Sequence, residues 1–348
     1  MPQSYALFYR GKRVLVTGHT GFTGGWLVAW LKLLGAKVCG YGLPPSSRPN
    51  FFDATLLDRG ITSIFADLRD RETLANTFAE SQPEVIFHTA HARHSSSDPV
   101  EVFSINVIGT INLLEEARLT GSARAIVLIS SAAQSWNASK CNLRRISSWP
   151  LASRTAAESA ALAFADSFFV ESRTRTAAAR FPKLISGGDW SETGLISDLV
   201  HGITAGEPIA VSDEVFHCWH VLDAASACLN LGEALYASES PASAACDFTC
   251  AARPILQAEF AKQFLKHWGS KGPEIEVIQS QRSEPDTSRA ETQVCPGSIC
   301  NLSLEQAIAW TVDWYRAYLA DPASAWRTTD AQIEEYGKLL SAPAASPG

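Results

Sequence analysis

A short glycine-rich turn near the N-terminus constrains the fold of this chain more than any other feature. Residues 14–24 read Val-Leu-Val-Thr-Gly-His-Thr-Gly-Phe-Thr-Gly and lead directly into the apolar helical segment 26–34. Gly18, Gly21 and Gly24 allow the backbone to turn tightly and to approach phosphate groups, while the new helix directs N–H groups at them. The pattern predicts a strand–turn–helix unit that holds a dinucleotide pyrophosphate.

The position of this turn favours that prediction over a glycine-rich turn that binds nothing. The turn follows the first apolar strand of the chain, its helix ends at Gly35, and a second apolar strand, 37–41, comes next. A dinucleotide-binding unit requires this order of elements.

Apolar strand-like segments alternate with helical segments through the first half of the chain. We expect strands at 14–17, 37–41, 61–65, 84–88, 125–130 and 176–181, and helices at 26–34, 71–80, 98–119 and 152–169. This alternation predicts an α/β fold, a Rossmann-type doubly wound parallel sheet with helices on both faces.

After Pro182 the pattern becomes irregular, which indicates a smaller C-terminal substrate lobe. We therefore expect a dinucleotide-binding Rossmann domain over residues 1–182 and a smaller lobe over 183–340 that is interleaved with it. Residues 341–348 are rich in Ala, Pro and Ser, and we expect them to form a frayed tail.

Composition narrows the class of protein. The formal net charge of −7 argues against a surface that binds nucleic acid. The sequence contains no run of about 18 apolar residues, so we expect no membrane span. The N-terminus lacks the pattern of a secretory signal, and the eight cysteines form no Cys-x-x-Cys pair. We expect a cytoplasmic protein with reduced thiols and a small-molecule ligand, without nucleic-acid or membrane partners.

Several further motifs carry a resemblance to a known family. Besides the glycine turn, they are 40–44 (Gly-Tyr-Gly-Leu-Pro), 67–70 (Asp-Leu-Arg-Asp), 98–101 (Asp-Pro-Val-Glu), 106–110 (Asn-Val-Ile-Gly-Thr), 187–190 (Gly-Gly-Asp-Trp), 220–223 (His-Val-Leu-Asp) and 332–336 (Gln-Ile-Glu-Glu-Tyr). Together they resemble the extended short-chain dehydrogenase/reductase family and, within it, the CDP-glucose 4,6-dehydratases. The resemblance implies a nicotinamide cofactor and a homodimer built from the helices 100–119 and 152–169.

The resemblance also implies which residues contact the cofactor. They are Gly18, Thr20, Gly21, Phe22, Thr23 and Gly24 at the phosphates, Asp67 and Leu68 at the adenine, and Thr89, Ala90, Ser130 and Arg154 further along the cofactor. An acidic residue at the end of the second strand is typical of NAD binding, but this chain has Gly42-Leu43 there and Arg48 a little further on. The resemblance favours NAD, and the residues themselves leave NADP open.

The catalytic residues of the family are missing from the matching positions. Its Tyr-x-x-x-Lys pair aligns with Pro150 and Arg154, and the polar residues expected after the fifth strand align with Ser131, Ala132 and Ala133. A guanidinium stays protonated and cannot act as the base. The sequence predicts that the usual proton-transfer groups are absent.

Other polar residues are candidates to replace them. These candidates are His91, Arg93, His94, Ser131 and Asp189, because histidine in particular can exchange protons near neutral pH. A solvated polar loop is an equally plausible interpretation of 91–94. A metal site at His88, His91 and His94 is disfavoured because no carboxylate completes a ligand set, and Cys218 shows no sign of a lowered pKa.

The substrate side also departs from the family pattern. Phe216-His217-Cys218-Trp219 replaces Arg-Pro-Trp-Gln, and Gly194 replaces a further arginine. We expect weak binding of nucleotide sugars, since charge-assisted contacts to a diphosphate are lost.

Three functions remain open at this point. The chain is an enzyme with altered chemistry on a small molecule, with a biosynthetic pathway as one setting; or a catalytically inert homologue that acts as a partner or regulator of another protein; or a working 4,6-dehydratase, as the family match alone implies.

Overall fold

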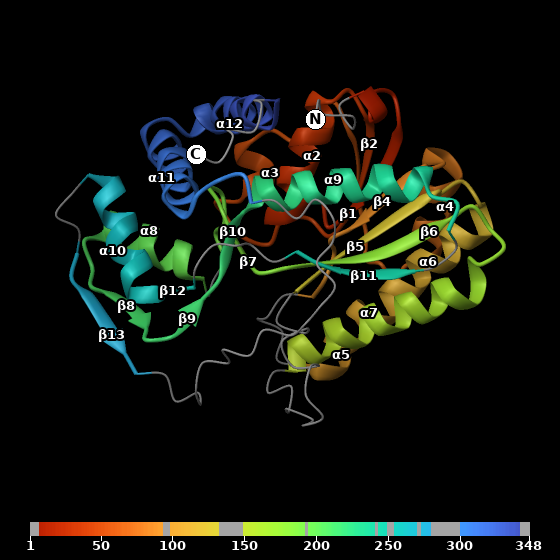
Figure 1. Ribbon diagram of the computed structural model, residues 1–348, viewed down its shortest axis with the longest axis horizontal. Helices are drawn as coiled ribbons and strands as arrows, with labels where there is room; N and C mark the ends of the chain where they lie inside the picture. Colours follow the sequence, from red (N-terminus) through yellow and green to blue (C-terminus); the bar gives the residue numbers. More distant parts are fainter. Residues whose placement is uncertain are drawn as a thin grey trace, which may run out of the picture.

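The computed structural model describes residues 7–92, 98–131, 149–191, 194–240, 243–248, 254–269, 273–279 and 300–341. Seven strands form one parallel sheet in the order β11-β6-β5-β4-β1-β2-β3 (Figure 1). They are β1 (Arg13–Thr17), β2 (Lys37–Gly42), β3 (Thr62–Phe65), β4 (Val85–His88), β5 (Ala125–Ser131), β6 (Arg175–Phe181) and β11 (Ala244–Asp247). The predicted doubly wound parallel sheet is confirmed.

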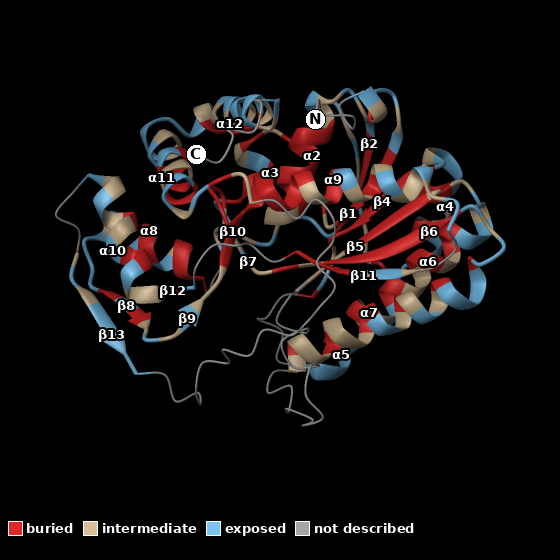
Figure 2. Cartoon of the chain, viewed as in Figure 1, coloured by how far each residue is buried: buried red, intermediate tan, exposed pale blue. Residues whose placement is uncertain are grey.

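Helices cover both faces of this sheet, and each face has its own core. On one face lie α2 (Phe22–Leu33) and α9 (Val221–Ala237), with α12 (Ala325–Ser341) packed against α2; on the other lie α4 (Arg71–Ser81), α6 (Gly109–Thr120) and α7 (Trp149–Phe168). Alternate residues of β1 serve the two cores: Val14 and Val16 face one, and Leu15 faces the other. Figure 2 shows the sheet strands buried along most of their length.

Over the described residues, the smaller lobe contains short paired strands and the helices α8, α10 and α11. Its elements are β7 (Lys183–Ile185), α8 (Leu195–Ala205), β8 (Ile209–Ser212), β9 (Val215–Phe216), β10 (Cys218–His220), β12 (Ile255–Leu256), α10 (Gln257–Trp268), β13 (Ile275–Ile278) and α11 (Leu304–Ala320). The strands pair two by two, as β10 with β7, β12 with β9 and β13 with β8. A short 3-10 turn, Pro322–Ser324, joins α11 to α12.

The second half of the chain completes the first domain. Strand β11 adds the seventh strand beside β6, and α9 packs against β4, β5 and β6. Sequence analysis did not predict β11, because its four residues, Ala-Ala-Cys-Asp, are too short and too weakly apolar to mark a strand. The seven-stranded sheet thus includes a strand from the second half of the chain.

The long helix expected over 98–119 is not one regular helix. It consists of α5 (Pro99–Phe103), a π-helical turn (Ser104–Ile108) and α6. Asp98 caps its start, where the carboxylate accepts a hydrogen bond from the N–H of Val100. A π turn inserts one extra residue and leaves the 3.6-residue period almost unchanged on either side, so the sequence pattern did not reveal it.

Candidate functional site

The glycine turn has the geometry of a phosphate cradle. Gly18 adopts a left-handed φ of +72°, and a Cβ atom there would lie 2.8 Å from the backbone of Ala90. A Cβ atom on Gly24 would lie 2.3 Å from the carbonyl oxygen of Gly18, so helix α2 can approach the turn only with glycine at this position. Gly21 begins α2 without a side-chain cap among the described residues, and the first turn of α2 contains no acidic residue.

This cradle fits a dinucleotide pyrophosphate. Around Gly21, a Cβ atom would meet only the carbonyl oxygen of Gly18, at 3.3 Å, so the space beside this glycine is not filled by the described protein atoms. The first N–H groups of a helix and its positive dipole end attract an anion at such a place. Thr20 ties the turn to the segment after β2, because its hydroxyl donates to the carbonyl of Leu43 at 2.8 Å.

The residues expected at the adenine lie at the end of β3. The carboxylate of Asp67 accepts hydrogen bonds from the guanidinium of Arg69 at 2.7 and 3.0 Å and from the Arg69 N–H at 2.8 Å. These contacts lower the pKa of Asp67. Leu68 is buried, and its carbonyl accepts from Asn112 at 3.2 Å. Both residues are therefore fixed by neighbouring elements.

A buried chain of hydrogen bonds runs beneath the next part of the site. Nδ1 of His88 lies 2.7 Å from the hydroxyl of Thr17, and Nε2 lies 2.9 Å from the hydroxyl of Thr110. The Thr110 hydroxyl donates to the carbonyl of Asn106 at 2.5 Å, so it accepts from Nε2–H of His88. His88 is thus neutral with its proton on Nε2, as expected for a packed, hydrogen-bonded residue at the strand end.

Asn106 joins two segments of the site. It lies in the π turn, where its side-chain oxygen accepts from the N–H of Ala92 at 2.7 Å and its amide donates to the hydroxyl of Ser153 at 2.7 Å. Ala92 follows His91, and Ser153 precedes Arg154 on α7. The motif 106–110 is visible in the sequence, but the role of Asn106 is not, because it depends on the contacts that this residue makes from the π turn.

A pocket opens between β4, β5, the π turn and α7. Its lining is His88, Ala90, His91, Asn106, Thr110, Leu128, Ile129, Ser130, Arg154, Ala157 and Glu158. The structure therefore brings four predicted site residues together here: Ala90, His91, Ser130 and Arg154. Thr89 lies next to them, buried, with its hydroxyl donating to the carbonyl of Thr17 at 2.6 Å.

Two of the pocket residues, His91 and Arg154, carry groups that can bind or transfer protons or hold a negative charge. Nδ1 of His91 lies 2.9 Å from the carbonyl of Thr89. A carbonyl only accepts, so Nδ1 carries a proton, and Nε2 is the basic nitrogen of the neutral ring. Arg154 is largely desolvated, which lowers its pKa, yet a guanidinium remains a cation at neutral pH. Pro150, which the sequence predicts to stand at the position of the family's tyrosine, is buried in the first turn of α7.

Glu158 belongs to a buried ion cluster that sequence analysis did not identify. Nε of Arg180 donates to Oε1 of Glu158 at 2.8 Å, and Nη1 donates to Asp247 at 3.4 Å. The three residues join α7, β6 and β11. Because β11 was not predicted, the sequence offered no signal for this cluster.

The remaining candidates lie elsewhere or outside the described residues. Asp189 lies in a turn, where its carboxylate accepts from the N–H of Ser191 and its carbonyl accepts from the hydroxyl of Tyr315 at 2.7 Å. Arg93, His94, Ala132 and Ala133 lie outside the described residues, as does the side chain of Ser131. Within the described ranges, no group of three or more His, Cys, Asp or Glu has the arrangement of a metal site.

The motifs 187–190, 220–223 and 332–336 have structural contacts. Gly187 and Gly188 leave no room for a Cβ atom against Trp314 and Phe51, and the carbonyl of Gly187 accepts from the indole of Trp26 at 3.1 Å. The carboxylate of Asp223 accepts from the hydroxyl of Tyr336 at 2.7 Å. These motifs hold the smaller lobe and α12 against α2 and α9.

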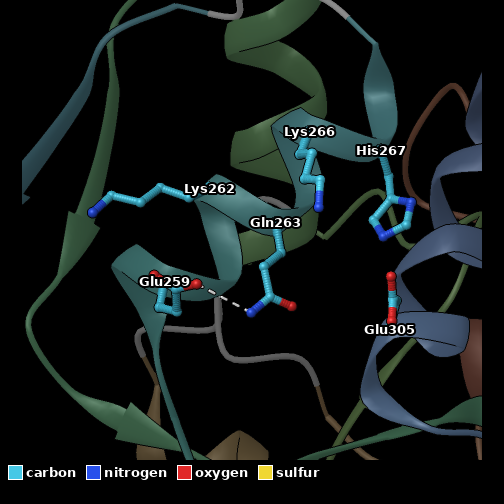
Figure 3. A pocket seen from close by; sticks show the side chains of 6 residues that line it. All are labelled: Glu259, Lys262, Gln263, Lys266, His267 and Glu305. Atoms are coloured by element: carbon cyan, nitrogen blue, oxygen red, sulfur yellow. Dashed lines mark hydrogen bonds between the residues drawn. The ribbon is translucent and has the colours of Figure 1, made fainter.

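Another pocket lies in the smaller lobe, away from the glycine turn. It is lined by Glu259, Lys262, Gln263, Lys266, His267 and Glu305, from α10 and the start of α11 (Figure 3). Gln263 donates to Glu259 at 3.1 Å, and the opening is lined by both basic and acidic side chains. Such mixed charge on exposed helix faces is ordinary for a solvated surface.

None of the described helices is long and apolar enough to cross a membrane.

Comparisons with known proteins agree with this geometry. Residues 14–243 match the family described as "NAD dependent epimerase/dehydratase family". The chain is 30% identical over 341 residues to a CDP-glucose 4,6-dehydratase of Salmonella typhimurium. This alignment covers 90% of this chain and 92% of that protein. It is also 40% identical over 118 residues to a UDP-glucose 4-epimerase of Mycolicibacterium smegmatis, over 33% of this chain and 37% of that protein.

Solved structures show the same fold. An epimerase from Methanothermobacter thermautotrophicus superimposes with a TM-score of 0.74 at 18% identity, covering 93% of this chain and 97% of that chain. A UDP-glucose 4-epimerase from Thermus thermophilus, crystallised with NAD, superimposes with a TM-score of 0.66 at 22% identity. The superposition covers 87% of this chain and 98% of that chain.

Proposed function

This chain belongs to the NAD dependent epimerase/dehydratase family, and on that premise we propose that it is an NAD-binding enzyme of altered chemistry. In this proposal the chain acts on a small molecule without the proton-transfer groups of a 4,6-dehydratase. The observation that carries the proposal is the pocket beside α7, which Arg154 and His91 line. The proposal also rests on the predicted alignment of Pro150, buried in the first turn of α7, with the tyrosine of the family.

NAD is the cofactor of this family, and bound NAD supplies a hydride acceptor. The N–H groups at the start of α2 and the glycines at 18, 21 and 24 would hold its pyrophosphate. Leu68 would lie at the adenine, and the guanidinium of Arg154 would supply a positive charge and hydrogen-bond donors to the ribose on the nicotinamide side. Arg154 provides the positive charge of a lysine there, although its planar fork directs hydrogen bonds differently.

His91 is the candidate proton carrier of the pocket. Its bond to Thr89 fixes the ring orientation and leaves Nε2 as the basic nitrogen. Histidine is the residue that most often acts as a general acid or base in enzymes. A proline side chain can neither accept nor donate a proton. If the chain is catalytic, another group must therefore perform the proton transfer that the family's tyrosine performs.

A glycine variant tests cofactor binding. We expect Gly21→Val to abolish NAD binding, because its side chain would occupy the space left for the pyrophosphate. Calorimetric titration with NAD measures the loss, and the unfolding temperature without NAD serves as the control for folding. Failure of the wild-type chain to bind NAD at millimolar concentration would contradict the proposal.

An activity assay tests the altered chemistry. We expect no useful conversion of CDP-glucose to its 4-keto-6-deoxy product with NAD, since general acid–base groups typically contribute about 10²–10⁴-fold each. Those losses do not simply multiply, but they remain large. The Salmonella relative, assayed in parallel, is the positive control. Turnover of about 1 s⁻¹ or faster would show that the chain is an ordinary 4,6-dehydratase.

The second candidate function is that of an inert homologue that binds NAD and acts on another protein. The intact cradle combined with Pro150 favours it. Nucleotides released from the purified protein by denaturation separate the two candidates: an enzyme that moves hydride carries both oxidised and reduced cofactor after incubation with its ligand, whereas an inert homologue keeps one form.

A further inference from the structure

The end of β2 lacks the group that usually selects NAD over NADP. A Cβ atom on Gly42 would lie 3.3 Å from the backbone nitrogen of Gly18, so position 42 directly adjoins the cofactor turn. In dinucleotide-binding folds, a carboxylate about 20 residues after the first glycine accepts from the ribose 2′-hydroxyl and repels a 2′-phosphate. Glycine at this position does neither.

The nearby carboxylates are already engaged. Within the uninterrupted described range 7–92, Asp53 accepts from the side-chain amide of Asn50 at 2.8 Å, and Asp67 is held by Arg69. The ring of His19, next to Gly18, is fully buried, and its pKa falls to about 4, so it is neutral at pH 7. The charge of Asp67 is therefore paired and His19 is uncharged, while the carboxylate of Asp53 is held by a neutral amide and keeps its negative charge.

A cation lies in the segment that follows β2. Arg48 is exposed and makes no ion pair with any described residue, whereas the charge of Arg69 is committed to Asp67. The segment that contains Arg48 contacts the cofactor turn at both ends. At one end the carbonyl of Leu43 accepts a hydrogen bond from the hydroxyl of Thr20, and at the other the ring of Phe52 lies 5.4 Å from the ring of His19. Arg48 therefore lies in a segment that is anchored beside the cofactor turn at both of its ends.

We infer that the adenosine end of this site accepts a 2′-phosphate through Arg48, so that the chain binds NADP within tenfold of its affinity for NAD. The inference rests on the proposed cofactor site. An arginine near the ribose is the usual means of holding a 2′-phosphate, because its guanidinium matches phosphate geometry.

Calorimetric titration of the full chain with NAD and with NADP tests the inference. We expect Arg48→Gln to weaken NADP binding by about tenfold or more, as for a charge-assisted hydrogen bond, and to change NAD binding less than twofold. Arg59→Gln is the matched control. Arg59 is an exposed arginine of the same β2–β3 connection, beside Lys32 in the last turn of α2, roughly 15 Å along the helix from the cofactor turn.

A second variant adds the missing charge. Leu43 is 55% exposed, so Leu43→Asp should fold normally and should weaken NADP binding without weakening NAD binding. NADP binding more than tenfold weaker than NAD binding in the wild type would overturn the inference and leave the proposed function intact. Equal effects of Arg48→Gln and Arg59→Gln on NADP would overturn the role of Arg48. Absence of binding by both dinucleotides would instead overturn the cofactor site itself.

Discussion

Single residues at this site are understood only through their hydrogen-bond partners. From the sequence, His88 was one of three histidines at a spacing that resembles a metal site. In the structure both of its ring nitrogens are used by Thr17 and Thr110, and burial lowers its pKa to about 4. The glycines were predictable because their role depends on the local backbone. The role of a histidine depends on residues far away in the sequence, which no local pattern reveals.

As the pH is lowered, this protein should unfold at a higher pH than the titration of its carboxylates alone would predict. The pKa of His88 is lowered from about 6.5 to about 4, so its contribution to stability is complete above pH 6.5 and is lost as the pH falls toward 4. The expected loss is on the order of 2–3 kcal/mol at pH 4.5. Urea unfolding at pH 7 and pH 4.5 measures it. His88→Gln should show a smaller pH dependence than the wild type, and an equal dependence would disprove the assignment.

Arg180 should be among the residues least tolerant of substitution. Arg180→Met leaves Glu158 and Asp247 buried without their shared cation, and breaking a buried ion pair costs about 3–5 kcal/mol. Arg13→Met is the control, because Arg13 is half exposed beside Glu84 and such surface pairs contribute about 0–1 kcal/mol. Chemical denaturation compares them. Similar losses for both variants would contradict the importance of the buried cluster.

At the scale of elements, the sheet strands and most of the helices before residue 182 could be predicted because apolar periodicity is a local signal. The π turn was not predicted, and no individual strand or helix after residue 182 was predicted, β11 included, because the local signal there is absent or irregular. The π turn places Asn106 inward, and from there it holds both the segment of His91 and the helix of Arg154. The candidate site could therefore be predicted at its glycines but not at the residues that fix its other wall.

Substitution of Asn106 should loosen that wall selectively. Asn106→Ala removes the acceptor for the N–H of Ala92 and the donor to Ser153, and each buried group left without a partner costs about 1–3 kcal/mol. Amide hydrogen exchange at Ala92 should become faster, while the amide of Leu15 in the sheet keeps its protection. Ser167→Ala, on the exposed side of α7, serves as the control. Unchanged exchange at Ala92 would disprove the linking role.

At the scale of the whole molecule, α5, the π turn, α6 and α7 carry exposed apolar side chains. Val100 is 78% exposed, and Ile108 and Phe168 are each more than half exposed. We expect a homodimer formed by these helices, which would bury the apolar side chains. Light scattering at micromolar concentration should give twice the mass of one chain, and Ile108→Glu should give the mass of one chain. A wild-type protein with the mass of a single chain would refute the dimer.

The late strand β11 has a consequence for the chain as it is made. Strand β6 ends at Phe181 and its neighbour begins at Ala244, so 62 residues separate them. At roughly 5–20 residues per second, the ribosome leaves the edge of β6 uncovered for roughly 3–12 seconds. During that interval an alanine-rich strand offers unpaired N–H and C=O groups to any other nascent strand. Overexpressed chains should therefore be most prone to aggregate when translation stalls before residue 244.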